Sequence, residues 1–332
     1  MEKFYPSLAD GFGRLLASLP GRPVAVIGHA RPDGDCIGSQ VALARILAAR
    51  GIEAICANPD PVPRRLQFLT PGLSFLRTDA LLARAAGAVA VFVDCADHAR
   101  AGERLQALFP APAGNIDHHL SNAGYAAVNL IDSGSAATCE ILAGLAFDFG
   151  LPVDARTAQA LYTGILTDTG QFRFASTSRR CFALAGELVA RGADPAVAGF
   201  ELYEQESAGR LKLLEHFLGS LRLEAGGRIC LGTLPAGIFE KTGTTAEDTE
   251  GLVDYARSIA GVDIGVLIEE RADGTLKASL RAKDPACRVD LVAAEFGGGG
   301  HACAAGLNLK SVQKDFLPRL IAALTQRLPP AR

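Results

Sequence analysis

The sequence predicts an α/β protein with a parallel-sheet N-terminal domain and flanking helices, a helical linker, and a smaller α+β C-terminal domain. Short apolar runs alternate with helical patterns in the first half of the chain. A long helical stretch follows, and strand-like runs return towards the C-terminus. The length of 332 residues is sufficient for two domains. We therefore expect domains at 1–192 and 220–332, joined by a helical connector at 193–219.

Apolar runs in the first half are predicted to be buried strands. They are Pro23–Gly28, Ile52–Ala57 and Ala88–Val93, with a helix from about Ile37 to Arg50 between the first two. Strands of a parallel sheet are covered by helices on both faces, so they are almost continuously hydrophobic. Such sheets bind ligands at the carboxyl ends of their strands. The residues that follow each run are therefore the candidates for a site.

The second half is predicted to change from helices to a mixed domain. The pattern is mainly helical over 135–191, with breaks at 150–152 and Gly170, and again over 194–219. Asp273-Gly274 is a typical hairpin turn between two strands. The predicted strands are Arg228–Leu234, Asp263–Glu269 and Thr275–Arg281, and the predicted helices are Ala246–Ile259 and Ser311–Leu328.

Composition limits the partners of the chain. The formal net charge of −3 gives no basis for bulk adhesion to long duplex nucleic acid or to an anionic membrane. Eight widely spaced cysteines without a C-x-x-C pair indicate reduced, mostly buried thiols. The N-terminus does not resemble a signal peptide, and no apolar run is long enough to span a bilayer. We expect a cytoplasmic protein whose nucleic-acid partner, if it has one, is small.

Acids and histidines gather where the apolar runs end. One group follows the first run, a second follows the third run, and another comes after Ile116. A further acid follows the helical run 158–167. In a parallel sheet the first three groups project from the same edge. The residues concerned are His29, Asp33, Asp35, Asp94, Asp117, His118, His119 and Asp168.

Such a group of residues suits a pair of divalent ions. Two ions about 3.5–4 Å apart can clamp a phosphate and activate a bridging water. Carboxylates offset their charge and imidazoles fix their geometry, whereas a thiolate zinc site would need cysteines at these positions. Taken singly, Asp33 or Asp35 could be a helix N-cap, His29 a loop residue and Asp168 a turn residue. Their joint occurrence favours a two-metal phosphoesterase site. Asp97 and Asp132 are interpreted as ordinary structural residues, with support of the ligands as the alternative.

These motifs resemble those of a known family. His29-x-x-x-Asp33-x-Asp35, Asp94, Asp117-His118-His119 and Asp168 are similar to the four motifs of the DHH phosphoesterase superfamily. The run from Gly297 to His301, followed by Ala304-Ala305-Gly306, resembles the signature of its DHH-associated domain. The resemblance covers nearly the whole chain in the family's order. The size matches the compact branch that includes bacterial oligoribonucleases, which also remove the 3′-phosphate of 3′-phosphoadenosine 5′-phosphate.

The resemblance implies a role for each residue of the cluster. It implies that His29, Asp33 and Asp94 hold one ion. It implies that Asp35, Asp94, His118 and Asp168 hold the other, with Asp94 bridging. His119 would face the scissile phosphate as the catalytic donor, and Asp117 would orient the histidine pair from behind. The implied cofactors are two divalent ions, with Mn²⁺ expected.

The second domain carries the predicted substrate-binding residues. A glycine run lets the backbone approach a ligand and turn its N–H groups towards an anion, although a flexible loop would explain the run alone. Arg281, at the end of a predicted strand, can bind a terminal phosphate through two hydrogen bonds. Ala282 stands where the family often has a small polar residue, which removes one candidate contact. The predicted substrate-binding residues are Arg281, Gly297, Gly298, Gly299, Gly300 and His301.

The expected function is two-metal hydrolysis of phosphate esters in short nucleotides. The substrates would be very short RNA, degraded by an exonuclease, or 3′-phosphoadenosine 5′-phosphate, or both. A soluble phosphodiesterase for linear or cyclic dinucleotides is an alternative. A non-catalytic nucleotide-binding protein is less favoured, because it would be expected to lack one or more metal ligands, and every ligand position is filled here. A family II pyrophosphatase is disfavoured because the expected basic Ser-Arg-Lys-Lys-type motif is not found. A RecJ-type exonuclease is disfavoured because it would normally carry an additional nucleic-acid-binding domain. Substrate preference, cleavage direction, the ion used and the oligomeric state stay open, with a homodimer as one option.

Overall fold

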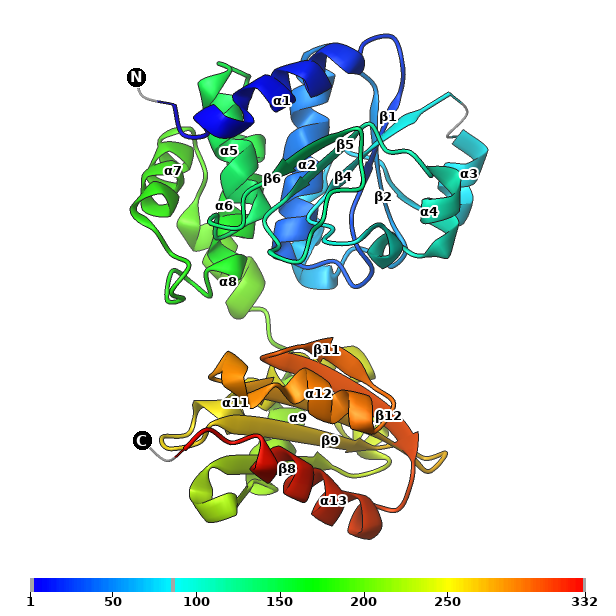
Figure 1. Ribbon diagram of the computed structural model, residues 1–332, viewed down its shortest axis with the longest axis vertical. Helices are drawn as coiled ribbons and strands as arrows, with labels where there is room; N and C mark the ends of the chain where they lie inside the picture. Colours follow the sequence, from blue (N-terminus) through cyan, green and yellow to red (C-terminus); the bar gives the residue numbers. More distant parts are fainter. Residues whose placement is uncertain (1–2, 85–86, 331–332) are drawn as a thin grey trace. The chain divides into compact units, whose positions relative to one another are not determined.

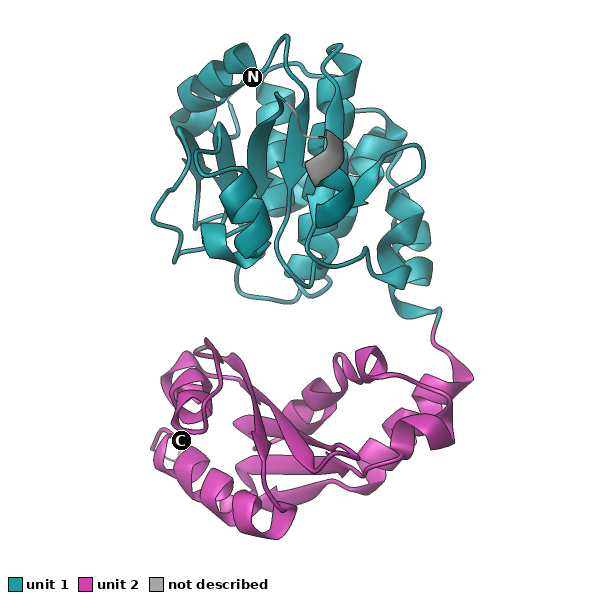
Figure 2. Cartoon of the chain, turned by 90° about the vertical axis from the view of Figure 1, so that its right-hand side faces the viewer, with its two compact units in different colours: residues 1–205 teal, residues 206–332 magenta. Residues whose placement is uncertain are grey.

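The computed structural model describes residues 3–84 and 87–330, without the side chains of 82–84 and 301. The chain forms two compact units, residues 1–205 and 206–332 (Figure 2). The division lies within the segment 193–219 that was expected to be a helical connector. Across the described residues, no helix could cross a membrane. All cysteines in this part of the chain are free, and seven of them are buried.

A parallel sheet forms the centre of the first unit, as the sequence predicted (Figure 1). Within the described residues it has six strands in the order β3-β2-β1-β4-β5-β6. The strands are β1 (Val24–Ile27), β2 (Ala54–Asn58), β3 (Phe75–Arg77), β4 (Val89–Val93), β5 (Gly114–Asp117) and β6 (Val128–Ile131). The three predicted strands correspond to β1, β2 and β4. The other three lack a continuous apolar run: β3 has only three residues, β5 has a single apolar side chain, Ile116, and Asn129 interrupts β6.

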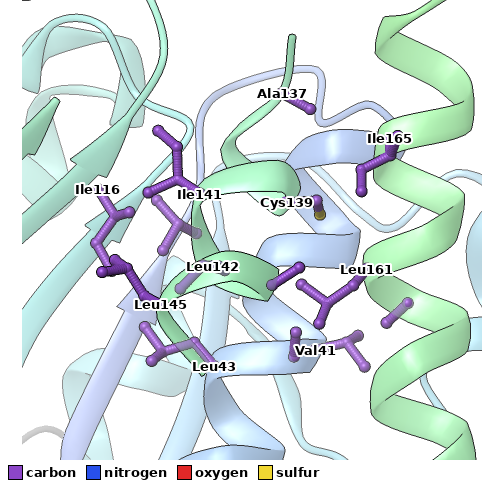
Figure 3. Close-up of a cluster of buried hydrophobic side chains, with 14 of the residues drawn as sticks. Val41, Leu43, Ile116, Ala137, Cys139, Ile141, Leu142, Leu145, Leu161 and Ile165 are labelled. Carbon is purple, nitrogen blue, oxygen red and sulfur yellow. The ribbon is translucent and has the colours of Figure 1, made fainter. Parts of the chain in front are cut away.

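Helices cover both faces of this sheet. Val24 and Val26 of β1 pack into one core with the larger helices, whereas Ala25 and Ile27 face a smaller core that includes Leu81. Figure 3 shows the larger core, where side chains of α2, α5, α6 and β5 meet. The helices on that side are α1 (Pro6–Ser18), α2 (Gly34–Ala49), α5 (Thr138–Asp148), α6 (Ala155–Asp168), α7 (Arg179–Ala190) and α8 (Pro195–Tyr203); those on the other are α3 (Thr78–Arg84) and α4 (Glu103–Leu108).

Glycines allow α2, α5 and α6 to pack closely. A Cβ atom at Gly38 would lie 2.5 Å from the carbonyl oxygen of Ala160, and one at Gly164 would lie 2.2 Å from Cys139 Sγ. The same Gly164 Cβ would lie 2.9 Å from Asp35 Oδ1. This close approach places the start of α2 beside the start of α5 and the end of α6.

The second unit is built on a mixed sheet in the order β11-β12-β10-β9-β8-β7. Its strands are β7 (Arg222–Glu224), β8 (Ile229–Leu234), β9 (Ile264–Glu270), β10 (Thr275–Ala282), β11 (Gly299–His301) and β12 (Ala304–Lys310). The helices of this unit are α9 (Ala208–Gly219), α10 (Ile238–Thr242), α11 (Leu252–Ser258), α12 (Val289–Glu295) and α13 (Gln313–Gln326). The predicted strands correspond to β8, β9 and β10. The predicted Asp273-Gly274 turn joins the last two, with Gly274 at a φ of +78°.

The glycine run differs from the loop that the sequence suggested. Gly297 lies two residues beyond the end of α12 with a φ of +77°, and the Gly298 N–H donates to Ala293 O at 2.8 Å. The run then enters β11, which pairs with β12. A Cβ at Gly298 would lie 2.2 Å from Gly306 O. The glycines therefore permit close backbone packing within this unit. Because glycines have no side chains, the run lacks the alternation of apolar and polar residues that would have predicted a strand.

The helix packing can be tested with a pair of alanine variants. We expect Gly164→Ala to lower the free energy of unfolding by about 1–3 kcal/mol, because the methyl group must displace Cys139 or Asp35. Gly186→Ala in α7 is the control, since nothing lies within 4 Å of its Cβ position. It should be neutral or stabilise by up to about 1 kcal/mol, from the higher helix propensity of alanine. Urea denaturation would measure both, and equal effects would contradict this account of the packing.

Candidate metal centre

The acids and histidines of the first unit meet at the carboxyl edge of its sheet. His29 comes two residues after β1, Asp94 follows β4 directly, and Asp117 ends β5. The helices supply the remaining acids. Asp33 is the N-cap of α2, with its Oδ1 accepting from the Cys36 N–H at 3.1 Å, and this cap starts the helix earlier than predicted. Asp35 lies in the first turn of α2, and Asp168 ends α6.

His118 lies at the centre of one group of carboxylates. Its Nε2 is 3.3 Å from Asp168 Oδ2, 3.6 Å from Asp94 Oδ1 and 3.9 Å from Asp35 Oδ2. Its Nδ1 is 3.3 Å from Ser135 O. Because a carbonyl can only accept a hydrogen bond, Nδ1 carries a proton, and Nε2 is the nitrogen that faces the acids. This is the usual arrangement of a metal-binding histidine.

His29 lies at the centre of a second group. Its Nε2 is 3.3 Å from Asp94 Oδ2 and 3.8 Å from Asp33 Oδ2, and its Nδ1 is 2.8 Å from Ala30 O. The ring is buried and is fixed by the same kind of backbone hydrogen bond as His118. Asp94 thus presents one carboxylate oxygen to His29 and the other to His118.

The backbone of Asp94 is unusual. Its φ of +54° lies in the left-handed region, which is rare for residues other than glycine. Such a conformation costs of order 1–3 kcal/mol and is found mainly at functional sites. The Asp94 N–H donates to Ile116 O at 3.0 Å, and Thr138 Oγ1 donates to Asp94 Oδ1 at 3.1 Å. Both the backbone and the carboxylate of Asp94 are therefore held in place.

The carboxylates of this edge repel one another. Burial, together with the charges of Asp35, Asp33 and Asp168, raises the pKa of Asp94 well above its usual value. Burial and the charge of Asp35 raise the pKa of Asp168 to about 7. Burial lowers the pKa of His118, but its hydrogen bond with Asp168 and the charge of Asp35 outweigh that effect and raise the pKa to about 9. The site therefore favours added positive charge.

Divalent ions fit this set of donors. Among the described residues, three groups of side chains have candidate ligand atoms within 4.8 Å of one another: Asp94, His118 and His119; Asp35, His118 and Asp168; and His29, Cys36 and Asp94. Cys36 was not predicted near the site. Burial raises the pKa of its thiol well above the usual value, which keeps the sulfur a poor ligand. Oxygen and imidazole donors thus dominate, as ions such as Mn²⁺ prefer.

His119 belongs to a different hydrogen-bond chain from His118. Its Nδ1 donates to Asp117 Oδ1 at 2.7 Å, and Asp117 Oδ2 accepts from Asn122 Nδ2 at 2.5 Å. On the other side of the ring, Nε2 lies 3.4 Å from Arg100 Nη1. The sequence analysis assigned no role to Arg100, Asn122 or Thr138. None of the three belongs to a motif. Only Arg100 could have been suspected from the sequence, because it lies in the segment that follows β4.

The predicted substrate-binding residues lie in the second unit. Arg281 of β10, Ala304 of β12 and His301 of β11 share one row of the sheet register. The side chain of His301 lies outside the described residues. The Arg281 guanidinium donates to Leu280 O at 3.1 Å and has no acidic partner among the described residues. Its positive charge is therefore available for an anion.

Comparison with known proteins gives matches over both units. The DHH family N-terminal domain matches residues 23–165, and the DHHA1 domain matches residues 228–328. The bifunctional oligoribonuclease and PAP phosphatase NrnA of Thermus thermophilus is 32% identical over 92% of this chain and 90% of its own length. The Bacillus subtilis protein of the same name is 27% identical over 89% and 91%. An exopolyphosphatase-related protein from Bacteroides fragilis, 24% identical, has the same fold, with a TM-score of 0.88 over 96% of this chain and 95% of that one.

Proposed function

Because the chain belongs to the DHH family, we propose that it hydrolyses phosphate esters in short nucleotides at the carboxyl edge of its parallel sheet. Family membership makes it a metal-dependent phosphoesterase. The oligoribonuclease and PAP phosphatase names of its relatives, which match over about nine-tenths of each chain, support very short RNA and 3′-phosphoadenosine 5′-phosphate as substrates. The observation that carries the proposal is the position of Asp94 between His29 and His118.

We assign the ligands of two ions to this edge. His29, Asp33 and Asp94 would hold one ion, and Asp35, Asp94, His118 and Asp168 would hold the other. Manganese or a similar ion suits these donors. When bound, such a pair clamps a phosphate and activates a water for attack on phosphorus. The carboxylates would hold the ions in place, and the positive charge of the ions would offset the repulsion among the carboxylates.

His119 is assigned as the catalytic residue. Asp117 accepts from Nδ1 and would stabilise the charged imidazolium, so Nε2 is the atom that can hold or release a proton. From Nε2, His119 would donate to a phosphate oxygen or to the leaving group. Arg100 beside it adds a second cationic donor on the same side of the site. A phosphate placed there would accept hydrogen bonds from both side chains.

The second unit is assigned to substrate binding. We propose that Arg281, His301 and the glycine run 297–300 bind a terminal phosphate of the substrate. The N–H groups of Gly297 and Gly298 already donate to Ala294 O and Ala293 O, so the backbone contact would come from Gly299 and Gly300. A charge-assisted hydrogen bond of this kind contributes roughly 1.5–3 kcal/mol. The net charge of −3 gives long nucleic acid little general attraction, so affinity depends on such local contacts. Short substrates with a terminal phosphate are favoured for this reason.

The two histidines should separate metal binding from catalysis. His118→Ala should weaken Mn²⁺ binding, because it removes a ligand. His119→Ala should keep the bound metal but lower kcat by roughly 10²–10⁴-fold, as expected for loss of a general acid or charge-stabilising donor. Metal analysis and steady-state kinetics on the two variants would measure this. Equal loss of metal in both would show that their roles are divided wrongly.

Substrate length should depend on Arg281. With manganese-loaded full-length protein, kcat/KM should fall steeply as oligonucleotides lengthen beyond a few residues. Arg281→Ala should flatten this preference by lowering activity on the shortest substrates most. Lys314→Ala is the control, because it removes an exposed positive charge from α13 of the same unit.

The substrate panel should contain short RNA and DNA, 3′-phosphoadenosine 5′-phosphate, linear and cyclic dinucleotides, and pyrophosphate. Turnover mainly of cyclic dinucleotides or pyrophosphate would contradict the proposed substrates. Efficient degradation of strands tens of nucleotides long, or an unchanged length preference in Arg281→Ala, would contradict the role given to the second unit.

A further inference from the structure

We infer that Arg180 is a positioning residue of the metal centre. Its guanidinium, on α7, fixes the backbone that begins α5, and that backbone orients three of the proposed ligands. Arg180 itself is assigned no contact with metal or substrate. The inference rests on the proposed two-metal site and adds to it a residue that lies outside every motif of the sequence.

The guanidinium of Arg180 binds three side chains through Nε and Nη2. Its Nε donates to Glu140 Oε1 at 2.8 Å, and its Nη2 donates to Asp132 Oδ2 at 3.0 Å and to Ser135 Oγ at 2.9 Å. The guanidinium carbon lies over the ring of Tyr5, 4.3 Å from its centroid. The Tyr5 hydroxyl is 2.8 Å from Ser135 Oγ, which closes the network.

Because the carboxylate of Glu140 is buried, the network needs the positive charge of Arg180. The Glu140 side chain is fully buried, and its second oxygen, Oε2, accepts from the Ala136 N–H at 2.6 Å. A buried carboxylate that loses its cation is strongly destabilised. Without Arg180, the buried charge of Glu140 would lose its cation, and a movement of Glu140 would shift the segment 132–137 with it. The ion pair thus specifies the path of this segment.

The same backbone orients the proposed ligands. Ser135 O accepts from His118 Nδ1. The N–H groups of Thr138 and Cys139 donate to the two oxygens of Asp35, at 2.6 and 2.8 Å. Thr138 Oγ1 donates to Asp94 Oδ1, as described above. A shift of residues 135–139 would therefore misplace His118, Asp35 and Asp94 together.

A lysine cannot replace this arginine. Arg180 reaches Glu140, Asp132 and Ser135 from fixed directions in one plane, whereas an ammonium group is a single point charge on a flexible stem. Arg180→Lys keeps the charge but loses the geometry. It is therefore the variant that separates positioning from simple charge compensation.

Another arginine of the same unit provides a matched control. Arg45 on α2 pairs with Asp154 and donates to Thr157 Oγ1, so it also links two segments that are distant in sequence. Its side chain is 20% exposed, against 30% for Arg180. Asp154 caps the start of α6, whereas Asp168 lies at the opposite end of that helix. Arg45→Lys should therefore lower stability without disturbing the metal centre.

The test compares wild type, Arg180→Lys, Arg45→Lys and Ser135→Ala as full-length proteins. The melting temperature, the Mn²⁺ dissociation constant from isothermal titration calorimetry, and kcat and KM at several Mn²⁺ concentrations would be measured. Arg180→Lys should raise the Mn²⁺ dissociation constant by about 10-fold, the lower end of the range for direct partners of metal ligands, because Arg180 acts through residues 135–139. Its kcat should recover as Mn²⁺ is raised, with the KM for the nucleotide unchanged. Arg45→Lys should lower the melting temperature but keep the wild-type metal affinity.

Ser135→Ala provides a milder variant if Arg180→Lys does not fold. It removes the hydroxyl from the network and keeps the carbonyl that accepts from His118, so it should weaken Mn²⁺ binding in the same direction by less. Wild-type metal affinity in folded Arg180→Lys or in Ser135→Ala would overturn the inference. So would equal weakening in Arg45→Lys. A wild-type protein that binds no Mn²⁺ would instead contradict the proposed metal site itself.

Discussion

The repulsion among carboxylates at one sheet edge is the constraint on which the structure of the first unit depends. Asp35 and Asp94 are buried there, with Asp33 and Asp168 beside them. The raised pKa values of Asp94 and Asp168 show that the fold alone leaves this negative charge undercompensated. Backbone N–H groups at the start of α5 offset part of it, and so does His118, whose pKa is raised by Asp168 and Asp35. Divalent ions would complete the compensation, and the same charge would then serve phosphate chemistry.

Much of the surrounding architecture keeps these groups together despite their repulsion. Glycines bring α2, α5 and α6 into close contact, which sets Asp35 near the last turn of α6. The left-handed backbone at Asp94 is maintained by hydrogen bonds from neighbouring elements. The ion pair between the half-buried Arg180 and the buried Glu140 is proposed to fix the segment before α5. The strained backbone of Asp94 and the buried charges thus lie at the sheet edge, where the proposed ligands must be held in place.

The fold class and the grouping of the candidate site residues could both be predicted from the sequence. Buried parallel strands are continuous apolar runs, so His29 and Asp94 could be placed at their ends, and topology brings those ends to one edge. Short strands such as β5 gave no such signal. Cys36, Arg100 and Thr138 were missed because their contacts follow from packing and not from spacing. Likewise, the glycine run offered no side-chain alternation, and its pairing as β11 is decided by β12.

The central claim is that two ions share Asp94 at this edge. Electron paramagnetic resonance of the manganese-loaded wild-type protein, with the metal content measured on the same sample, tests it most directly. Two Mn²⁺ ions about 3.5–4 Å apart and bridged by a carboxylate are magnetically coupled. The account predicts two manganese ions per chain and a coupled spectrum. One ion per chain with the six-line spectrum of isolated Mn²⁺ would contradict it.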